Sequence, residues 1–290
     1  MSRLQEHINS GNFVITAEIG PPKGTDVSKV VNKLKFYDKE KIVSVNITDN
    51  QRAVMKMSPI ATSCIVKEQG YEPILQLTCR DRNRISLQSE LLGASALGIK
   101  NILALTGDHI SAGDHKDAKP VFDLDSVTLI RAIHTLNSGY DMSGNKLAGK
   151  TDFFVGGVIN PCSANMELQL LRLEKKVKAG LQFVQTQAVY DLDVYREFYN
   201  EASKNNIAVL AGILLLKSAK MARFLNAKVP GVKVPDSLID ILDNSADPVK
   251  EGIEIAKDII LSIKEFGHGV HLMSIAQEKE IGELVREINI

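Results

Sequence analysis

The chain has 290 residues, 44% of them hydrophobic, and its 35 basic and 35 acidic residues give no formal net charge at pH 7. This length allows a large buried core, and the neutral balance argues against nucleic acid or an anionic membrane as the main partner. The first residues lack the apolar stretch of a signal peptide, and no apolar run approaches the ~20 residues that span a bilayer. We therefore expect a cytoplasmic protein with no membrane span.

The potential metal ligands and thiols of the chain form no recognisable site. Cys64, Cys79 and Cys162 lie far apart and never form a C-x-x-C pair, which favours reduced, buried cysteines over a disulfide framework. Histidines and aspartates gather at residues 109–117, but their spacing matches no zinc pattern. We expect a solvated lid there and no metal site.

Short apolar runs alternate with helical patterns along the whole chain. The first run, residues 13–19, ends abruptly at Gly20 and Pro21, and Asp26 is placed to cap the helix that follows as far as Leu34. The other predicted strands are residues 41–48, 73–79, 101–105, 152–158, 181–187, 207–214 and 269–273. The other predicted helices are residues 59–68, 87–97, 125–136, 165–179 and 194–205, one from 218, 235–242, one from 248, and 278–288.

This alternation predicts an α/β fold, a (β/α)8 TIM barrel forming a single domain over residues 1–290. Strands that are apolar on both faces are typical of parallel sheets covered by helices, and such barrels have ~250 residues. A doubly wound open sheet is the alternative, but no G-x-G-x-x-G follows the first strand and no P-loop motif occurs. Residues 138–150 are expected to form a surface excursion at the amino-terminal end of the barrel.

Polar residues gather where the predicted strands end. Because the carboxyl ends of barrel strands meet at one face, these groups should surround a single site. They are Glu18, Asn46, Thr48, Gln76, Thr78, Thr106, Asp108, Asn160, Gln187, Lys217, His271 and Ser274. The set has amides, hydroxyls and few carboxylates. These groups suit a ligand that is held by hydrogen bonds and that takes part in one proton transfer. It lacks the glycine-rich cradle of phosphosugar barrels and the multiple ligands of metallohydrolases.

Motifs at these positions resemble those of the methylenetetrahydrofolate reductase family over nearly the whole chain. They are residues 17–23 (AEIGPPK), 44–47 (SVNI), 77–79 (LTC), 104–108 (ALTGD), 175–180 (KKVKAG), 186–187 (TQ) with Asp191, 212–214 (GIL) and 269–271 (GVH). Each string is short, but their order and spacing follow the family. The resemblance implies a flavoenzyme with a (β/α)8 barrel that reduces 5,10-methylenetetrahydrofolate to 5-methyltetrahydrofolate.

The same resemblance implies roles for individual residues. Glu18 corresponds to the general acid that protonates folate N10 and opens the five-membered ring, and the N5 iminium then accepts hydride from reduced flavin N5. Asp108 corresponds to the aspartate that stabilises this cation, and Gln187 to the glutamine that binds the pterin. Flavin contacts are implied for Asn46, Gln76, Thr106, Gly107, Asp108 and Lys176, with Lys176 suited to a phosphate.

The chain also departs from the family pattern. The family often has Thr, His and Arg at the positions of Asn46, Gln76 and Thr106, so FMN becomes an alternative to FAD. Ala219 and Gln277 replace an aromatic residue and an arginine of the nicotinamide-dependent members, which leaves direct use of NADH or NADPH open. The chain is similar to the branch of acetogenic bacteria, which implies an iron–sulfur partner subunit and an oligomer or hetero-complex.

Two other functions stay open at this point. One is a non-catalytic barrel that binds folate or scaffolds a complex, and the other is a pterin-dependent methyltransferase barrel that needs no flavin. The retention of Glu18, Asp108 and Gln187 together favours the reductase. The arginines at 80, 82 and 84 either meet the glutamate tail of a folate or belong to a charged loop, and their pattern favours the loop.

Overall fold

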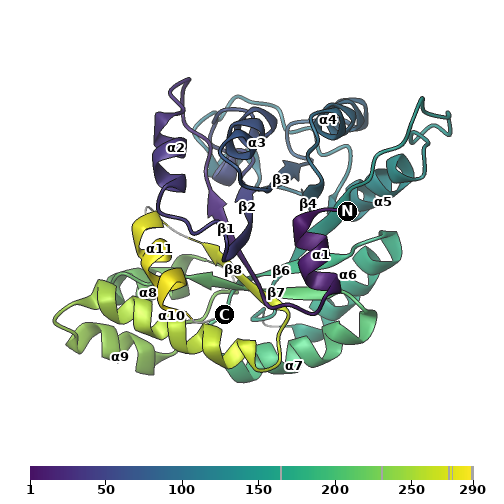
Figure 1. Cartoon of the computed structure of the whole chain (residues 1–290). Helices are drawn as coiled ribbons and strands as arrows, with labels where there is room; N and C mark the ends of the chain where they lie inside the picture. Colours follow the sequence, from purple (N-terminus) through teal and green to yellow (C-terminus); the bar gives the residue numbers. More distant parts are fainter. Residues whose placement is uncertain (164, 230, 274, 276, 289–290) are drawn as a thin grey trace.

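The computed structural model describes residues 1–163, 165–229, 231–273, 275 and 277–288, and within them eight parallel strands form a closed barrel. Each strand pairs with the next along the chain, and β8 closes the barrel by pairing with β1 (Figure 1). The strands are β1 (Val14–Ile19), β2 (Ile42–Ile47), β3 (Pro73–Thr78), β4 (Asn101–Leu105), β5 (Phe154–Ile159), β6 (Phe183–Ala188), β7 (Ala208–Leu214) and β8 (Gly269–Met273). The predicted (β/α)8 barrel is confirmed.

Helices surround the barrel and connect its strands, as the sequence predicts. They are α2 (Ser28–Leu34), α3 (Pro59–Glu68), α4 (Arg84–Ala96), α5 (Ser126–Asn137), α6 (Met166–Ala179), α7 (Leu192–Ala202), α8 (Ala219–Lys228), α9 (Asp236–Asn244), α10 (Pro248–Lys264) and α11 (Glu278–Glu287). Side chains of Asn83, Asp125, Asn165 and Asp191 accept backbone N–H groups at four helix starts. No described helix is long and apolar enough to cross a membrane.

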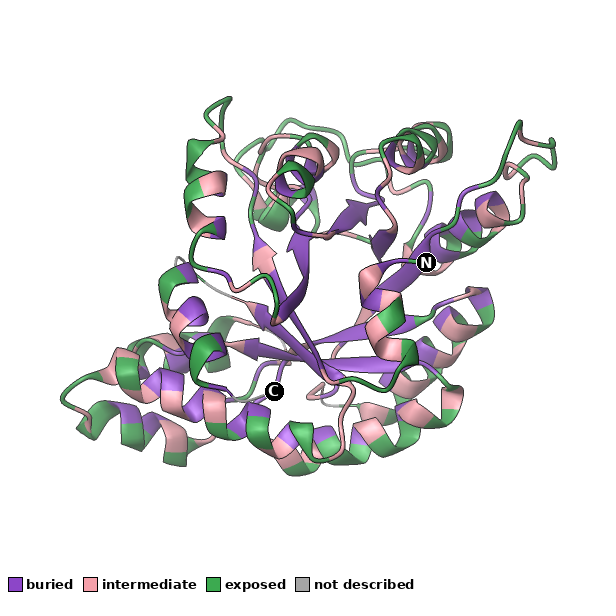
Figure 2. Ribbon diagram, viewed as in Figure 1, coloured by how far each residue is buried: buried purple, intermediate pink, exposed green. Residues whose placement is uncertain are grey.

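The strands are buried on both faces, whereas the helices are buried on one (Figure 2). On β1, Ile15, Ala17 and Ile19 pack outward against the helices as part of the main hydrophobic core. The residues between them, among them Thr16 and Glu18, point into the barrel, where they meet side chains of β6, β3 and β8. This period of two decides which residues support the fold and which reach the barrel interior.

A helix that the sequence did not predict, α1 (Arg3–Asn9), closes the amino-terminal end of the barrel. Leu4 is fully buried there against the lowest inward side chains of the strands. The Glu72 carboxylate accepts the backbone N–H groups of Arg3 and Leu4 at 2.8 and 2.9 Å. These bonds satisfy N–H groups that have no partner within a first helical turn.

The lower barrel interior is an apolar floor. Its buried members are Leu4, Val14, Val43, Ile74, Leu103, Phe154, Phe183, Ala208 and Leu210. The rings of Phe154 and Phe183 stack with their centroids 5.0 Å apart. A Cβ at Gly156 would lie 2.2 Å from the Phe183 ring, so only glycine leaves room for this packing. The floor therefore fills the barrel and leaves space for a ligand only toward the carboxyl ends of the strands.

Residues 138–150 leave the body of the protein between α5 and β5, as predicted (Figure 1). Tyr140 and Lys146 form a single antiparallel bridge, and Asp141 Oδ1 accepts the N–H groups of Ser143 and Asn145 at 2.8 Å. The excursion follows a helix and precedes a strand, so it lies at the end of the barrel opposite the strand carboxyl ends.

Candidate active site

A cavity of about 360 Å³ opens at the carboxyl ends of the strands, and we call it the strand-end cavity. It contains six of the eight residues to which the family resemblance gives a role: Glu18, Gln76, Thr106, Gly107, Asp108 and Gln187. The rest of its lining is Asp49, Gln51, Thr78, Arg80, Leu103, Leu105, Val158, Gln185, Thr186, His271 and Met273. Its size falls in the range of ~300–1,000 Å³ that small-molecule sites occupy.

Glu18 lies at the inner wall of this cavity, and its side chain is 14% exposed. Gln76 Nε2 donates to Glu18 Oε2 at 3.4 Å, and His271 Nε2 lies 3.8 Å from the same oxygen. The Tyr37 hydroxyl donates to the Glu18 backbone carbonyl at 3.0 Å, which fixes the strand at this point. The carboxyl group therefore has neighbours on two strands, β3 and β8, and still reaches the cavity.

His271 connects Glu18 to the barrel interior. Its Nδ1 lies 3.0 Å from Thr16 Oγ1, which is itself 3.4 Å from the Val270 carbonyl. With Thr16 donating to Nδ1, the Nε2 proton faces an ionised Glu18. Alternatively, His271 Nδ1–H donates to the Thr16 hydroxyl, and that hydroxyl donates to the Val270 carbonyl. The unprotonated Nε2 of His271 then faces a protonated Glu18. Both proton arrangements keep the Thr16–His271 bond, so this pair accommodates either protonation state of the Glu18 carboxyl group.

Asn46 lies beneath the strand-end cavity rather than in its wall. Asn46 and Gln185 are buried and exchange two amide hydrogen bonds of 2.7 and 3.1 Å, and Gln185 Nε2 also lies 3.4 Å from Thr16 Oγ1. We call Thr16, Asn46, Gln185 and His271 the polar layer. Asn46 supports Gln185, which does line the cavity. Direct contact between Asn46 and a flavin stays a prediction.

Asp108 lies exposed at the rim, where the backbone of two loops positions it. The Arg52 N–H donates to Asp108 Oδ2 at 3.0 Å, from a turn in which Arg52 and Ala53 have φ of 58° and 55°. Such left-handed conformations are rare for residues with a side chain. Gly107 has φ of 91°, and a Cβ there would lie 3.0 Å from Thr78 Cβ. Both features bring the carboxylate of Asp108 over the cavity.

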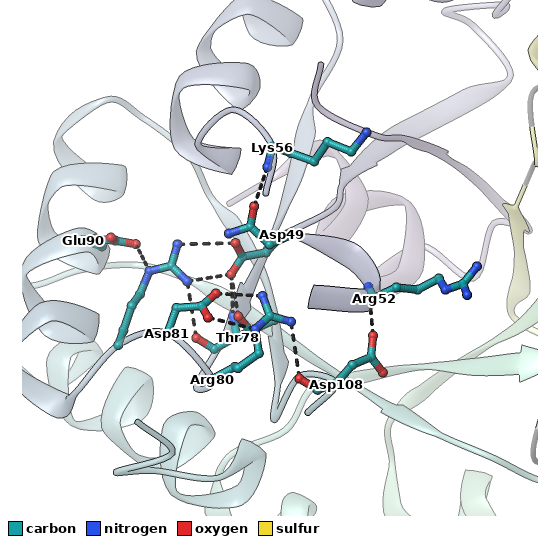
Figure 3. A network of polar contacts seen from close by, with 10 residues as sticks. Asp49, Arg52, Lys56, Thr78, Arg80, Asp81, Glu90 and Asp108 are labelled. Atoms are coloured by element: carbon teal, nitrogen blue, oxygen red, sulfur yellow. Dashed lines mark hydrogen bonds and ion pairs between the residues drawn. The ribbon is translucent and has the colours of Figure 1, made fainter. Parts of the chain in front are cut away.

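A buried charged network beside the cavity ties the ends of β2 and β3 together (Figure 3). Asp49 Oδ2 accepts both the N–H and the hydroxyl of Thr78 at 2.8 Å, and Arg82 pairs with the Asp49 carboxylate at 2.7 Å. Arg80, whose side chain is 2% exposed, binds both Asp81 oxygens. The hydrogen bonds that Arg80 donates to Asp81 raise the pKa of Arg80. Arg80 and Arg82 belong to a charged loop, as expected, and their carboxylate partners allow the two side chains to be largely buried.

Lys176 is placed behind the cavity wall. It is buried between α6 and β5 and donates to the carbonyl of Val158 at 2.7 Å. Burial lowers the pKa of Lys176 to about 8, because the charged ammonium loses its hydration. Val158 itself lines the cavity, so Lys176 touches the wall from outside. Its contact to a flavin phosphate stays a prediction.

Thr48 and Lys217, which the sequence also placed at the strand ends, are not part of the lining of the strand-end cavity. Thr48 lines a neighbouring cavity, Lys217 donates to the Ile275 carbonyl at 3.4 Å, and Ser274 lies outside the described residues. In the loop at 109–117, Asp114 pairs with Lys23 at 2.7 Å. Among the described residues, no group of His, Cys, Asp and Glu could hold a metal ion.

Sequence reasoning missed several lining residues for two different reasons. Leu103, Leu105 and Gln185 follow from counting inward positions by two along their strands, so the signal was present in the sequence. Asp49 and Arg80 carry no such signal, because a charged residue after a strand is ordinarily solvated. Their place in the wall depends on ion pairs between loops that lie far apart in the sequence.

Comparison with known proteins identifies relatives across the whole chain. The 5,10-methylenetetrahydrofolate reductase of Buchnera aphidicola is 27% identical over 256 residues, covering 86% of this chain and 80% of that protein. Methylenetetrahydrofolate reductase 2 of Schizosaccharomyces pombe is 24% identical over 302 residues and covers 98% of this chain. The chain spans only 46% of the length of that yeast relative.

A solved structure shares the fold, and a family model places the chain among known proteins. A protein from Clostridium thermocellum that binds two copies of 5-methyl-5,6,7,8-tetrahydrofolic acid superposes with a TM-score of 0.70 at 18% identity, covering 98% of this chain and 97% of that one. At this identity the likeness shows the barrel fold alone. The model of the methylenetetrahydrofolate reductase family, however, matches residues 3–289, and the chain therefore belongs to that family.

Proposed function

We propose that the protein reduces 5,10-methylenetetrahydrofolate to 5-methyltetrahydrofolate with a bound flavin. The observation that carries this proposal is the joint placement of Glu18, Asp108 and Gln187 around one cavity at the carboxyl ends of the strands. The names of the relatives and the methyltetrahydrofolate bound by the Clostridium thermocellum protein support a folate as the ligand.

Glu18 acts as the general acid. It delivers a proton to N10 of the folate, which opens the five-membered ring and leaves a cationic iminium at N5 of the substrate. The Gln76 amide and His271 face the carboxyl group and hold it in place. Positioned acids of this kind contribute ~10²–10⁴-fold to a rate.

Asp108 and Gln187 act on the pterin itself. The Asp108 carboxylate, fixed by the Arg52 N–H, stabilises the positive charge that develops at N5. Gln187 binds the ring by hydrogen bonds from its amide. The reaction turns a neutral folate into a cation before hydride arrives, so a fixed negative charge at the rim lowers the barrier.

The lining of the strand-end cavity fits a flavin ring. Leu103, Leu105, Val158 and Met273 supply apolar surface for its faces, and the amides of Gln76 and Gln187 supply hydrogen bonds for its edges. When bound, reduced flavin supplies the hydride. We assign Gln76, Thr106, Gly107 and Asp108 to this contact, with Asn46 supporting it from below and Lys176 receiving a phosphate. FAD follows the family, and FMN is the alternative.

An absorption spectrum of the purified protein tests the proposal. We expect a bound flavin whose visible band is bleached when 5-methyltetrahydrofolate is added without oxygen. A colourless protein that still binds folate would contradict the proposal and favour a folate-binding scaffold or a pterin-dependent methyltransferase. Release of the flavin by heat followed by chromatography separates FAD from FMN.

The electron donor is a second part of the proposal. Ala219, which is buried at the start of α8, and Gln277 stand where nicotinamide-dependent members carry an aromatic residue and an arginine. We therefore propose that an iron–sulfur subunit in a hetero-complex reduces the flavin. The purified chain should reduce its flavin only slowly with NADH or NADPH, and rapid reduction by either nucleotide would contradict the need for a partner.

A further inference from the structure

Asp108 lies at an exposed rim, and backbone contacts fix where its carboxylate points. The Arg52 N–H donates to Asp108 Oδ2 at 3.0 Å, and Arg80 Nη1 donates to the Asp108 backbone carbonyl at 3.5 Å (Figure 3). The Arg52 N–H projects from the turn at residues 50–53, which also contributes Gln51 to the wall of the strand-end cavity. The direction of the Asp108 carboxylate therefore depends on the backbone of this turn.

The turn at residues 50–53 has an unfavourable backbone conformation. Asn50, Arg52 and Ala53 have φ of 44°, 58° and 55°. Left-handed residues that carry a side chain persist only where the surrounding structure holds them, and asparagine tolerates this conformation best. Asn50 Oδ1 accepts the Lys56 N–H at 2.8 Å, which joins the two ends of the turn. Ala53, between these ends, has to be held by another part of the chain.

Gly113 packs directly on Ala53. A Cβ at Gly113 would lie 1.9 Å from the Ala53 carbonyl oxygen, 2.6 Å from the Ala53 carbonyl carbon and 2.9 Å from Ala53 Cβ. The φ of Gly113 is −103°, which residues with a side chain also adopt. Glycine is therefore needed at this position for space alone, because only a bare Cα lets the two backbones touch.

The segment that carries Gly113 begins at Asp108 itself. The chain then forms a short 3₁₀ helix, η2 (Ile110–Ala112), whose first carbonyl accepts the Gly113 N–H at 2.9 Å. The residue after Gly113 is Asp114, which pairs with Lys23 of the loop after β1 at 2.7 Å. The segment is therefore anchored on both sides of the contact between Gly113 and the turn at residues 50–53.

We propose that Gly113 is a positioning residue for Asp108. By packing on Ala53, Gly113 holds the turn at residues 50–53 in the left-handed conformation that directs the Arg52 N–H at the Asp108 carboxylate. This inference rests on the proposed function, in which Asp108 stabilises the cation formed on the pterin. Gly113 is not part of the lining of the strand-end cavity, so it acts on the site only through the turn.

Nuclear magnetic resonance of the protein labelled with ¹⁵N-arginine tests this contact without any ligand. An amide proton that donates to a carboxylate is deshielded, so the wild-type Arg52 signal should lie downfield of its position in Asp108→Ala, which lacks the acceptor. The variant Arg52→Lys assigns the signal. In Gly113→Ala we expect the Arg52 signal at the Asp108→Ala position. A signal that stays at the wild-type position would overturn the inference, because the turn would then hold without Gly113.

Two further variants separate the contact from other effects of a substitution. Gly24→Ala is the matched control, because Gly24 lies in the loop after β1 and a Cβ there would meet no atom within 4 Å. Ala53→Pro opens the turn without a change at Gly113, because proline fixes φ at about −65° where the turn has 55°. The Arg52 signal should keep its wild-type position in the control and reach the Asp108→Ala position in Ala53→Pro. The opposite result in either variant would overturn the inference.

Turnover at saturating folate adds a readout that a purely structural role would not give. We expect Gly113→Ala to slow hydride transfer to the folate about tenfold, while reduction of the flavin by an artificial donor keeps its rate. In the Asp108→Asn background, Gly113→Ala should slow hydride transfer no further. Equal factors in the two backgrounds would overturn the inference, because Gly113 would then not act through Asp108. If Asp108→Asn leaves turnover unchanged, the proposed role of Asp108 fails, and the Arg52 signal still decides whether Gly113 positions the carboxylate.

Discussion

The two ends of the barrel interior have opposite chemistry, although the same strands build both. At the amino-terminal end the inward residues are Val14 on β1, Ile74 on β3 and Phe183 on β6. Two residues further along these strands, the inward positions hold Thr16, Gln76 and Gln185. The change from an apolar to a polar interior takes place over one repeat of the strand.

The two ends of the barrel interior are stabilised in different ways. The apolar floor has no polar side chain to satisfy, so its contribution depends on packing and on the area removed from water. The polar layer above it is held by a chain of hydrogen bonds from Asn46 through Gln185 and Thr16 to His271. Changes in the floor should therefore affect folding, and changes near the cavity should affect turnover.

The largest expected effect comes from Glu18→Gln. This change removes the proton but keeps the shape, so folate turnover should fall by ~10²–10⁴-fold. Reduction of the flavin by an artificial donor should persist, because that step does not use the acid. Stopped-flow measurement of the two half-reactions distinguishes them.

Glu72→Gln is the matched control at the other end of the barrel. Glu72 accepts the N–H groups of Arg3 and Leu4, so its loss should lower stability and leave turnover per folded molecule intact. If Glu18→Gln kept folate turnover, Glu18 would lose its proposed role. A loss of turnover in Glu72→Gln would break the contrast between the two ends.

Phe183→Ala tests the floor. The ring is fully buried, stacks on Phe154 and fills the space above Gly156. Its removal leaves a cavity, and such changes cost ~3–5 kcal/mol of unfolding free energy. Urea unfolding followed by circular dichroism measures the loss. An unfolding free energy close to that of the wild type would contradict the role of the floor in stability. A marked loss of turnover per folded molecule would show that the two ends of the barrel interior are not separate in function.

Lys176→Met tests a buried charge at the edge of the polar end. The pKa of Lys176 in the folded protein is about 8, and a lysine in an unfolded chain has a pKa of ~10.4. Between these values the unfolded state binds more protons, so the stability of the native protein rises with pH in this window. The variant should be more stable at pH 7 by ~1–2 kcal/mol, and this advantage should shrink toward pH 10.

Unfolding experiments from pH 7 to pH 10 measure this difference, and the flavin content of the purified variant separates two roles. Loss of flavin together with the stability change supports a phosphate contact. Full flavin content means that Lys176 only fills the space between α6 and β5. A stability difference that grows with pH would contradict the inferred burial of the ammonium group.

The sequence predicts the barrel well because its signals are local. Strand and helix positions follow from apolar periodicity and from caps such as Asp125, and the predicted strand at residues 101–105 agrees in full with β4. The helix α1 was not predicted because it is short and because the N–H groups of its first turn bind the carboxylate of Glu72, which is distant in the sequence.

The site was predictable only in part, for a related reason. Strand ends and family motifs identify Glu18, Asp108 and Gln187, which line the cavity together. They do not reveal how deep in the barrel a side chain lies. Asn46 therefore lies beneath the cavity and Lys176 behind its wall, and the sequence motifs predicted neither position. Depth depends on the barrel register and on side chains from other strands, and neither is encoded in a short motif.

The smallest change in free energy that we predict is a coupling between Asn46 and Gln185, measured by giving the polar layer the apolar character of the floor. Asn46→Val or Gln185→Leu alone leaves a buried amide without its partner, which costs ~1–3 kcal/mol. The double variant removes both amides, so it should be less destabilised than the sum of the single changes by about 1 kcal/mol. A double-mutant cycle by urea unfolding measures this coupling. If the double variant regains stability but binds no flavin, the polar layer serves the cofactor. If it keeps both stability and flavin, Asn46 and Gln185 only continue the packing of the floor. The residues needed for function then begin one level higher in the barrel, at Glu18.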